Sequence, residues 1–151
     1  MSPALLLTLV QIHDLAVKHG FEDPDTAAAV AWAESVGNPA ASLIVTQAQA
    51  DAYNAAHPTG PRHGPERSFG LWQVNALVWT RFDETQLTDP DYCAEAALLI
   101  SRGGTHWQPW STYNSGLYRR FMPSERPTLP DLAPNASALL DPDDEGPDTA
   151  A

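Results

Sequence analysis

Three stretches of the sequence share an order of residues that is typical of an α-helix. Each begins with Ser or Asp followed by proline, continues with apolar residues at helical spacing, and ends at glycine. Proline lacks the amide hydrogen that stays unpaired in a first helical turn, and glycine readily adopts the left-handed angles that end a helix. The pattern predicts helices that open at Ser2-Pro3, Asp23-Pro24 and Asp89-Pro90 and stop at Gly20, Gly37 and Gly103, with Arg102 in the last turn of the third.

Two further helices are expected between and after these stretches. Apolar and aromatic residues at helical spacing indicate one from about Gln108 to Met122, and a shorter one is expected around residues 43 to 56. The loop over residues 57–68 is rich in Pro, Gly and His and should be exposed. No alternating run is long enough for a convincing strand, although a small β-ribbon within residues 43–75 stays open. We therefore expect an all-α fold, or a mainly α fold with a small β-ribbon.

The composition changes at Pro123. The last 29 residues hold six prolines and seven acids against one arginine, so they carry −6 of the formal net charge of −11. A segment of this kind cannot bury enough apolar surface to fold. We predict one folded domain over residues 1–122 and a disordered tail over residues 123–151. The negative charge argues against nucleic acid or an anionic membrane surface as the main partner.

Cysteine and histidine usage excludes several kinds of site. Cys93 is the single cysteine, so no intrachain disulfide forms, and its place in an apolar helical run predicts a buried, unreactive thiol. The five histidines show no metal-ligand spacing, so we expect neither a metal nor a cofactor. No apolar run reaches the roughly 18 residues of a membrane span, and the N-terminus lacks the basic start of a signal peptide. We therefore expect synthesis in the cytoplasm without membrane insertion.

One carboxylate stands at the end of an Ala-rich apolar stripe. Ala27, Val30, Ala31 and Glu34 fall on one face of the second predicted helix. If that face meets the core, Glu34 is partly buried, and burial raises a carboxyl pKa so that the acid stays protonated near neutrality. Helical spacing alone also allows an ordinary solvated Glu near a helix end.

Two other segments carry polar or aromatic residues in unusual settings. In "RSFGLWQVN", Gly70 suggests a tight turn or a close approach by a ligand, and Gln73 and Asn75 either order a polar group beside a cleft or bond to backbone in a core. In "HWQPWSTYNSGLYRRF", the aromatic residues either stack on sugar rings or, for two or three of the five, pack in the core.

Together, three motifs resemble the lysozyme-like superfamily, specifically the soluble lytic transglycosylase type of domain and its goose-type lysozyme relatives. "AESVGNPAAS" resembles the family's ES-x-x-NP motif, "FGLWQVN" its GLMQ-type motif, and "YNSG" its YNxG motif. The resemblance spans roughly residues 8–122. The forms "ERSFGLWQVN" and "WQPWSTYNSGLY" are most similar to those of bacteriophage tail-associated lysins and endolysins.

The resemblance assigns roles to individual positions. Glu34 matches the catalytic acid, and Tyr113 matches the tyrosine whose hydroxyl points toward that acid. Trp72 replaces the usual Met of the second motif and would narrow the cleft floor. About 25 residues between "AAS" and "FGLWQ" leave part of the cleft rim undefined. The predicted substrate-binding residues are Ser35, Ser42, Ser68, Gln73, Asn75, Asn114 and Gly116.

The implied function is cleavage of peptidoglycan glycan strands by a lytic transglycosylase. Glu34 would protonate the bond between N-acetylmuramic acid and N-acetylglucosamine and then accept a proton from the muramic C6 hydroxyl, giving a 1,6-anhydro product. Such a reaction needs a single acid, and no second carboxylate has a clear claim in the sequence. A goose-type hydrolase is the alternative, with Glu66, Asp83 or Asp89 to be considered as its base.

A non-catalytic wall-binding virion protein is the rival from another class. The chain is expected to act as a monomer or as part of a phage particle, carried in the virion or released by a holin.

Overall fold

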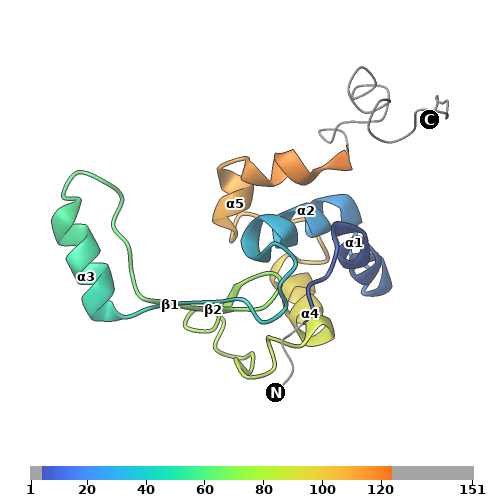
Figure 1. The fold of residues 1–151 in the computed structure, drawn as a ribbon, viewed down its shortest axis with the longest axis horizontal. Coiled ribbons are helices and arrows are strands. Elements are labelled where there is room, and N and C mark those ends of the chain that lie inside the picture. Colours follow the sequence, from blue (N-terminus) through green and yellow to red (C-terminus); the bar gives the residue numbers. More distant parts are fainter. Residues whose placement is uncertain (1–4, 124–151) are drawn as a thin grey trace, which may run out of the picture. The chain divides into compact units, whose positions relative to one another are not determined.

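The computed structural model describes residues 5–123, and within that range the fold is mainly α-helical with one small sheet, as expected (Figure 1). The three strands form an antiparallel sheet in the order β1-β2-β3. Residues 1–4 and 124–151, which include nearly all of the predicted disordered tail, lie outside the described residues. The elements are α1 (Leu9–Lys18), α2 (Pro24–Ser35), β1 (Ser42–Val45), α3 (Gln47–Ala56), β2 (Glu66–Phe69), β3 (Val74–Asn75), α4 (Pro90–Ile100), α5 (Ser111–Asn114) and the 3-10 helix η1 (Leu117–Phe121).

Helices α2 and α4 begin as the sequence predicts. The side chains of Asp23 and Asp89 accept hydrogen bonds of 3.1 and 2.9 Å from backbone amides three residues further on, and proline follows each of them. Helix α2 ends where Val36 and Gly37 adopt left-handed angles, with φ of 50° and 80°. Helix α4 is shorter than predicted, because Arg102 has a φ of 55° and lies beyond the last turn.

The predicted start of the first helix is wrong. Helix α1 begins at Leu9, where Thr8 and Gln11 form a reciprocal capping box. The preceding described residues are not helical, and the amide of Leu7 donates instead to the carbonyl of Gly37 at 2.8 Å. This contact ties the N-terminal segment to the end of α2, so the cap at Thr8 decides where the helix starts.

The single helix predicted from Gln108 to Met122 is also wrong. The chain forms the short helix α5 and the 3-10 helix η1, which are separated by a break at Gly116 with a φ of 84°. The side chain of Asn114 donates to the carbonyl of Gln108 at 2.8 Å, which ties α5 back to the turn before it. A left-handed residue and a side chain bonded to the backbone both interrupt a continuous helix.

The β-ribbon that the sequence left open is present. Strand β1 occupies the start of the helix expected around residues 43 to 56, and α3 begins only at Gln47, after a capping box of Thr46 and Gln49. Ser68 lies at the centre of the sheet, opposite Leu43 of β1 and Asn75 of β3. Part of the segment predicted as a loop therefore belongs to β2.

Helix α3 stands apart from the other helices, at the far end of the ribbon formed by β1 and β2 (Figure 1). The side chain of Asn54 closes the following loop, because its amide accepts from the backbone nitrogen of His63 and donates to its carbonyl, both at 2.8 Å. The residues between "AAS" and "FGLWQ" thus form a projecting segment, which is held together by the β1–β2 pairing and by the hydrogen bonds between Asn54 and His63.

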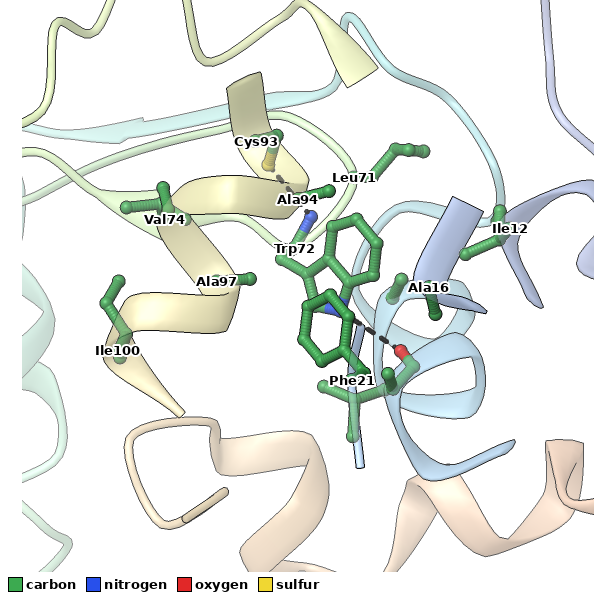
Figure 2. Packing of buried hydrophobic residues seen from close by; sticks show 14 of the residues in the cluster. Ile12, Ala16, Phe21, Leu71, Trp72, Val74, Cys93, Ala94, Ala97 and Ile100 are labelled. Carbon is green, nitrogen blue, oxygen red and sulfur yellow. Dashed lines mark hydrogen bonds between the residues drawn. The ribbon is translucent and has the colours of Figure 1, made fainter. Parts of the chain in front are cut away.

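The core lies between α1, α2 and α4 and is centred on Trp72 (Figure 2). The indole of Trp72 stacks on Phe21 with ring centroids 5.6 Å apart and donates to the carbonyl of Ala27 at 3.0 Å. Its backbone amide contacts the sulfur of Cys93 at 3.4 Å. Cys93 is fully buried, as predicted, and burial raises the pKa of its thiol to about 12.

Two of the five aromatic residues near the C-terminal end of the domain belong to this core. Trp107 and Trp110 are buried, with ring centroids 5.0 Å apart. The indole of Trp110 donates to the carbonyl of Trp72 at 2.7 Å, which holds the segment before α5 against the core. Within residues 5–123, no helix has the length and apolar character needed to cross a membrane.

Candidate active site

Glu34 ends the buried face of α2. Ala27, Val30 and Ala31 are fully buried, and Glu34, one turn beyond them, is partly exposed at the penultimate position of the helix. The stripe predicted from helical spacing therefore faces the core. The carboxyl group emerges where the apolar face meets a cleft.

The cleft has a volume of about 250 Å³ and is formed by four parts of the fold, one of which is the end of α4 at Ile100. Helix α2 supplies Glu34, the segment before and at the start of α5 supplies one wall, and the sheet with its following turn supplies the other. Four of the residues that the sequence predicted for the site line this cleft: Glu34, Ser68, Gln73 and Asn75.

The surroundings of Glu34 favour its protonated form. Burial raises the pKa of this carboxyl above its usual value, and the negative charge of Glu66 raises it further. The hydroxyl of Thr112 donates a hydrogen bond of 2.8 Å to Glu34 and acts in the opposite direction, but the pKa remains raised. A carboxylic acid held protonated in a cleft can donate a proton to a bound ligand.

In "FGLWQVN", the side-chain amide groups of Gln73 and Asn75 each form hydrogen bonds to the backbone through one of their two polar atoms. The nitrogen of the Gln73 side chain donates to the carbonyls of Ala41 and Gly70 at 2.9 and 3.0 Å. The side-chain oxygen of Asn75 accepts from two backbone amides at 3.3 and 3.1 Å. Within the described part of the chain, the Gln73 oxygen and the Asn75 nitrogen have no protein partner. Each cleft-lining amide can therefore offer one polar group to a ligand.

Strand β2 brings a second carboxylate to the cleft. Glu66 and Ser68 are two residues apart in the strand, so they share one face of the sheet, and both line the cleft. The hydroxyl of Ser68 donates to the Glu66 carboxylate at 2.6 Å, and Ser68 itself is fully buried. This pair lies beside Asn75, the partner of Ser68 across the β2–β3 ladder.

The other two carboxylates considered as a base lie elsewhere. Asp83 accepts hydrogen bonds from the amide and the hydroxyl of Thr85 at 2.9 and 2.7 Å, and these bonds lower its pKa. Asp89 is the N-cap of α4. The carboxylates of Asp83 and Asp89 accept hydrogen bonds from residues two or three positions further along the chain, and neither residue lines the cleft.

Three predicted site residues near α5 do not line the cleft. Tyr113 stacks on Tyr118 with ring centroids 4.7 Å apart, and its hydroxyl makes no hydrogen bond to any described residue. Asn114 bonds to the backbone before α5, and Gly116 forms the break that follows it. The side chain that reaches Glu34 is that of Thr112, one residue before the expected tyrosine.

Two predicted serines also lie outside the cleft. Ser35 is buried, and its hydroxyl donates to the carbonyl of Ala31 at 2.9 Å within α2. Ser42 is exposed at the start of β1, opposite Phe69. Trp72, expected to narrow the cleft floor, belongs to the core instead.

Two residues in or beside the cleft, Thr112 and Trp79, were missed by sequence reasoning, and Glu66 was named only as one of three candidate bases. Glu66 was placed in a loop, although its spacing of two from Ser68 is the period of a strand face. Thr112 gave no signal of its own inside the aromatic segment. Trp79 lines the cleft and is partly exposed, a setting that a sequence pattern does not distinguish from core.

Across residues 5–123, no three His, Cys, Asp or Glu side chains are grouped so that they could hold a metal ion. The chemistry that this arrangement can perform with its own groups is proton transfer from Glu34, beside a second carboxylate and two oriented amides.

The chain was compared with known protein families, curated proteins and solved structures. A family described as "Lysozyme like domain" matches residues 13–112, which is about two thirds of the chain. No curated protein and no solved structure matches the chain. The matched range runs from α1 into α5 and includes every residue that lines the cleft.

Proposed function

The chain belongs to the family of lysozyme-like domains, which act on peptidoglycan, and on that premise we propose that it is a lytic transglycosylase. Its substrate would be the β-1,4 bond between N-acetylmuramic acid and N-acetylglucosamine in a glycan strand. The observation that carries the proposal is the raised pKa of Glu34 in a cleft that also presents the amides of Gln73 and Asn75.

The proposed reaction uses Glu34 twice. Its proton passes to the glycosidic oxygen while the bond from that oxygen to muramic C1 breaks, and the bonding electrons leave with the oxygen. The muramic C6 hydroxyl then attacks C1, and its proton passes to the Glu34 carboxylate. The products are a glycan end with a free N-acetylglucosamine hydroxyl and a 1,6-anhydromuramic end, and Glu34 is again protonated. The attacking group is already part of the substrate, so it reacts without the entropic cost of capturing a water.

Binding groups would come from the sheet side of the cleft. The free oxygen of Gln73 can accept from a sugar hydroxyl or acetamido nitrogen, and the free nitrogen of Asn75 can donate to a carbonyl. Ser68 acts through Glu66 rather than on the sugar, because its hydroxyl is already donated. Roles for Ser35, Ser42, Tyr113, Asn114 and Gly116 rest on the resemblance alone and stay predictions.

Hydrolysis is the second candidate, and the position of Glu66 is the observation that favours it. A hydrolase that inverts the sugar needs a carboxylate base to activate water opposite the acid. The sequence offered no clear partner for Glu34, and Glu66, which lines the same cleft, supports this alternative.

Muropeptide analysis separates these reactions. Purified protein is incubated with peptidoglycan, and the soluble products are identified by mass spectrometry. We expect 1,6-anhydromuramic ends, which lack one water relative to the reducing ends that a hydrolase produces. Glu34→Gln should release neither product, and digestion by that variant at the wild-type rate would refute the assignment. Binding to glycan without any release by the wild type would indicate the wall-binding virion protein.

We further propose that the protein is a bacteriophage protein. This assignment has a single basis. It rests on the similarity of "ERSFGLWQVN" and "WQPWSTYNSGLY" to phage lysin segments. Carriage in a virion and release by a holin would both bring the protein to the cell wall, and detection of the chain in purified particles would select the first.

A further inference from the structure

We propose that Glu66 is a second catalytic carboxylate of this cleft, whose negative charge stabilises the positive charge that develops on the muramic ring as the C1–oxygen bond breaks. The inference rests on the proposed cleavage reaction and adds a residue and a role to it. It starts from the placement of Glu66 and Ser68 on the face of the sheet that lines the cleft.

The carboxylate of Glu66 is held in place from within the fold. Its Oε2 accepts the Ser68 hydroxyl at 2.6 Å, and Ser68 is fully buried at the centre of the sheet, between β1 and β3. A donor fixed in the core orients the acceptor that it binds. The second oxygen of Glu66 has no partner among the residues that the structure describes, so it is available to the cleft.

Among the described residues, no cationic side chain is paired with the Glu66 carboxylate. The neighbouring Arg67 points to the other face of the strand, as alternation requires, and its guanidinium donates to both oxygens of Glu84 at 3.0 and 2.7 Å. An unneutralised carboxylate at the wall of a cleft is suited to a ligand that becomes positively charged.

The two carboxylates of the cleft stand in different surroundings. Glu34 emerges from the Ala-rich face of α2, where burial raises its pKa, whereas Glu66 is hydrogen-bonded to Ser68 on a sheet face that lines the cleft. Glu66 also acts electrostatically on Glu34, since its charge is one of the causes of the raised Glu34 pKa. Glycosidic cleavage uses one neutral acid and one anion in the same site, and the raised pKa of Glu34 favours the neutral form at that position.

In the reaction, Glu66 forms no covalent bond and moves no proton. The glycosidic oxygen takes the bonding electrons and the Glu34 proton, while the charge left on the sugar ring lies near the Glu66 anion. The C6 hydroxyl closes the anhydro ring and returns its proton to Glu34. Glu66 thus lowers the energy of the charged intermediate stage and, through its effect on Glu34, keeps the donor protonated to higher pH.

The test is Glu66→Gln, with Glu84→Gln as a matched control. Both changes remove one negative charge and keep the side-chain length, but Glu84 lies outside the cleft. We expect Glu66→Gln to lower kcat about 100-fold with little change in KM, the size of effect seen when one preorganised charge-stabilising group is removed. The alkaline limb of its pH–rate profile should move to lower pH, because the pKa of Glu34 falls once the neighbouring charge is gone. Glu66→Asp should recover part of the rate.

Two results would overturn the proposal. The first is a Glu66→Gln variant that reacts at the wild-type rate and whose pH–rate profile keeps its alkaline limb at the wild-type position. The second is rescue of Glu66→Gln by azide with formation of a glycosyl azide, because an external nucleophile replaces an activated water only if Glu66 is a base in a hydrolytic reaction.

The experiments distinguish a failure of the proposed cleavage reaction from a failure of the role proposed for Glu66. A wild type that releases no muropeptides would refute the cleavage reaction itself and, with it, the catalytic role of Glu66. Titration of the Glu34 carboxyl by carbon NMR needs no substrate and reports the electrostatic part alone. The Glu34 pKa should be lower in Glu66→Gln than in the wild type or in Glu84→Gln, and equal values in all three would contradict the coupling.

Discussion

The hydroxyl of Thr112 donates a hydrogen bond of 2.8 Å to the carboxylate of Glu34, which joins the first turn of α5 to the end of α2. The bond fixes the direction of the acid, and it also stabilises the charged form. Burial and the charge of Glu66 raise the pKa of Glu34, and the Thr112 bond lowers it. The pKa of Glu34 is therefore set by its burial and by two residues from other elements, Thr112 of α5 and Glu66 of β2.

Replacement of Thr112 by valine removes the hydroxyl and keeps the shape of the side chain. The pKa of Glu34 should rise further, because the bond that favoured its charged form is lost. The alkaline limb of the pH–rate profile should move to higher pH, opposite to the shift expected for Glu66→Gln. The maximal rate should fall roughly tenfold, the factor that corresponds to the loss of one orienting hydrogen bond. Initial rates on peptidoglycan across a pH series provide the measurement.

Thr105→Val is the control for this change, because the Thr105 hydroxyl donates to a backbone carbonyl at 3.2 Å in an exposed turn. Its profile should match that of the wild type. A limb that moves to lower pH in Thr112→Val would show that the bond does not favour the charged form of Glu34.

The parts of the fold that were predictable depend on local chemistry. Asp23 and Asp89 cap their helices because the cap, the proline and the first amides are adjacent in sequence. The start of α1 was missed because its cap at Thr8 is accompanied by a contact between Leu7 and Gly37, thirty residues apart. A pattern of neighbouring residues carries no information on such a contact.

In the candidate site, too, residues with local sequence signals were predictable and residues placed by long-range contacts were not. Glu34 could be identified because the stripe that buries it lies on its own helix, and the resemblance then supplied a role. Glu66 was one of three candidate bases and could not be singled out from the sequence, because its position depends on the pairing of β2 with β1 and β3. Thr112 could not be identified either, because its bond to Glu34 joins residues 78 positions apart in the sequence.

The stability of the domain should depend on pH through His19. Burial lowers the pKa of this imidazole, but hydrogen bonds and charge interactions with Asp91 and Glu95 outweigh burial and raise it above 6.5. Both ring nitrogens face carboxylates, with Nε2 at 2.8 Å from Asp91, so the imidazolium is the favoured form. The charged imidazole stabilises the folded state fully below pH 6.5, which is the pKa of His19 in the unfolded chain. This stabilisation is lost as the pH rises through the raised pKa of His19 in the folded state.

His19→Gln should therefore destabilise the protein more at pH 5.5 than at pH 8.5, by about 1 kcal/mol or less because the cluster lies near the surface. Urea unfolding at the two pH values measures the difference. His106→Gln serves as the control, since no ion pair of His106 exists among the described residues. A greater loss at pH 8.5 would contradict the direction of the pKa shift.

Gly70 should tolerate no side chain. It has a φ of +87°, and a Cβ there would stand 2.1 Å from the carbonyl oxygen of Leu87 and 2.7 Å from the sulfur of Cys93. Gly70→Ala combines an unfavourable backbone angle with a backbone clash, so we expect a loss of about 3 kcal/mol or more in the free energy of unfolding. Gly20→Ala has the same type of angle, with a φ of +82°, but open space around the Cβ. It should cost only about 1 kcal/mol, and equal losses in urea unfolding would show that the clash is relieved.

Trp79 should bind substrate without taking part in the chemistry. Trp79 is partly buried against the core and lines the cleft, and an aromatic ring in such a wall can stack on the apolar face of a sugar. Trp79→Ala should raise KM roughly tenfold with kcat little changed, because stacking is equally strong in the ground state and the transition state. Trp79→Phe keeps an aromatic face and should recover most of the affinity. Leu77→Ala, two residues away and outside the cleft, controls for disturbance of the turn. A fall in kcat at unchanged KM in Trp79→Ala would instead mean that the ring supports the position of the reacting groups, and a lowered melting temperature in the same variant would trace that fall to packing.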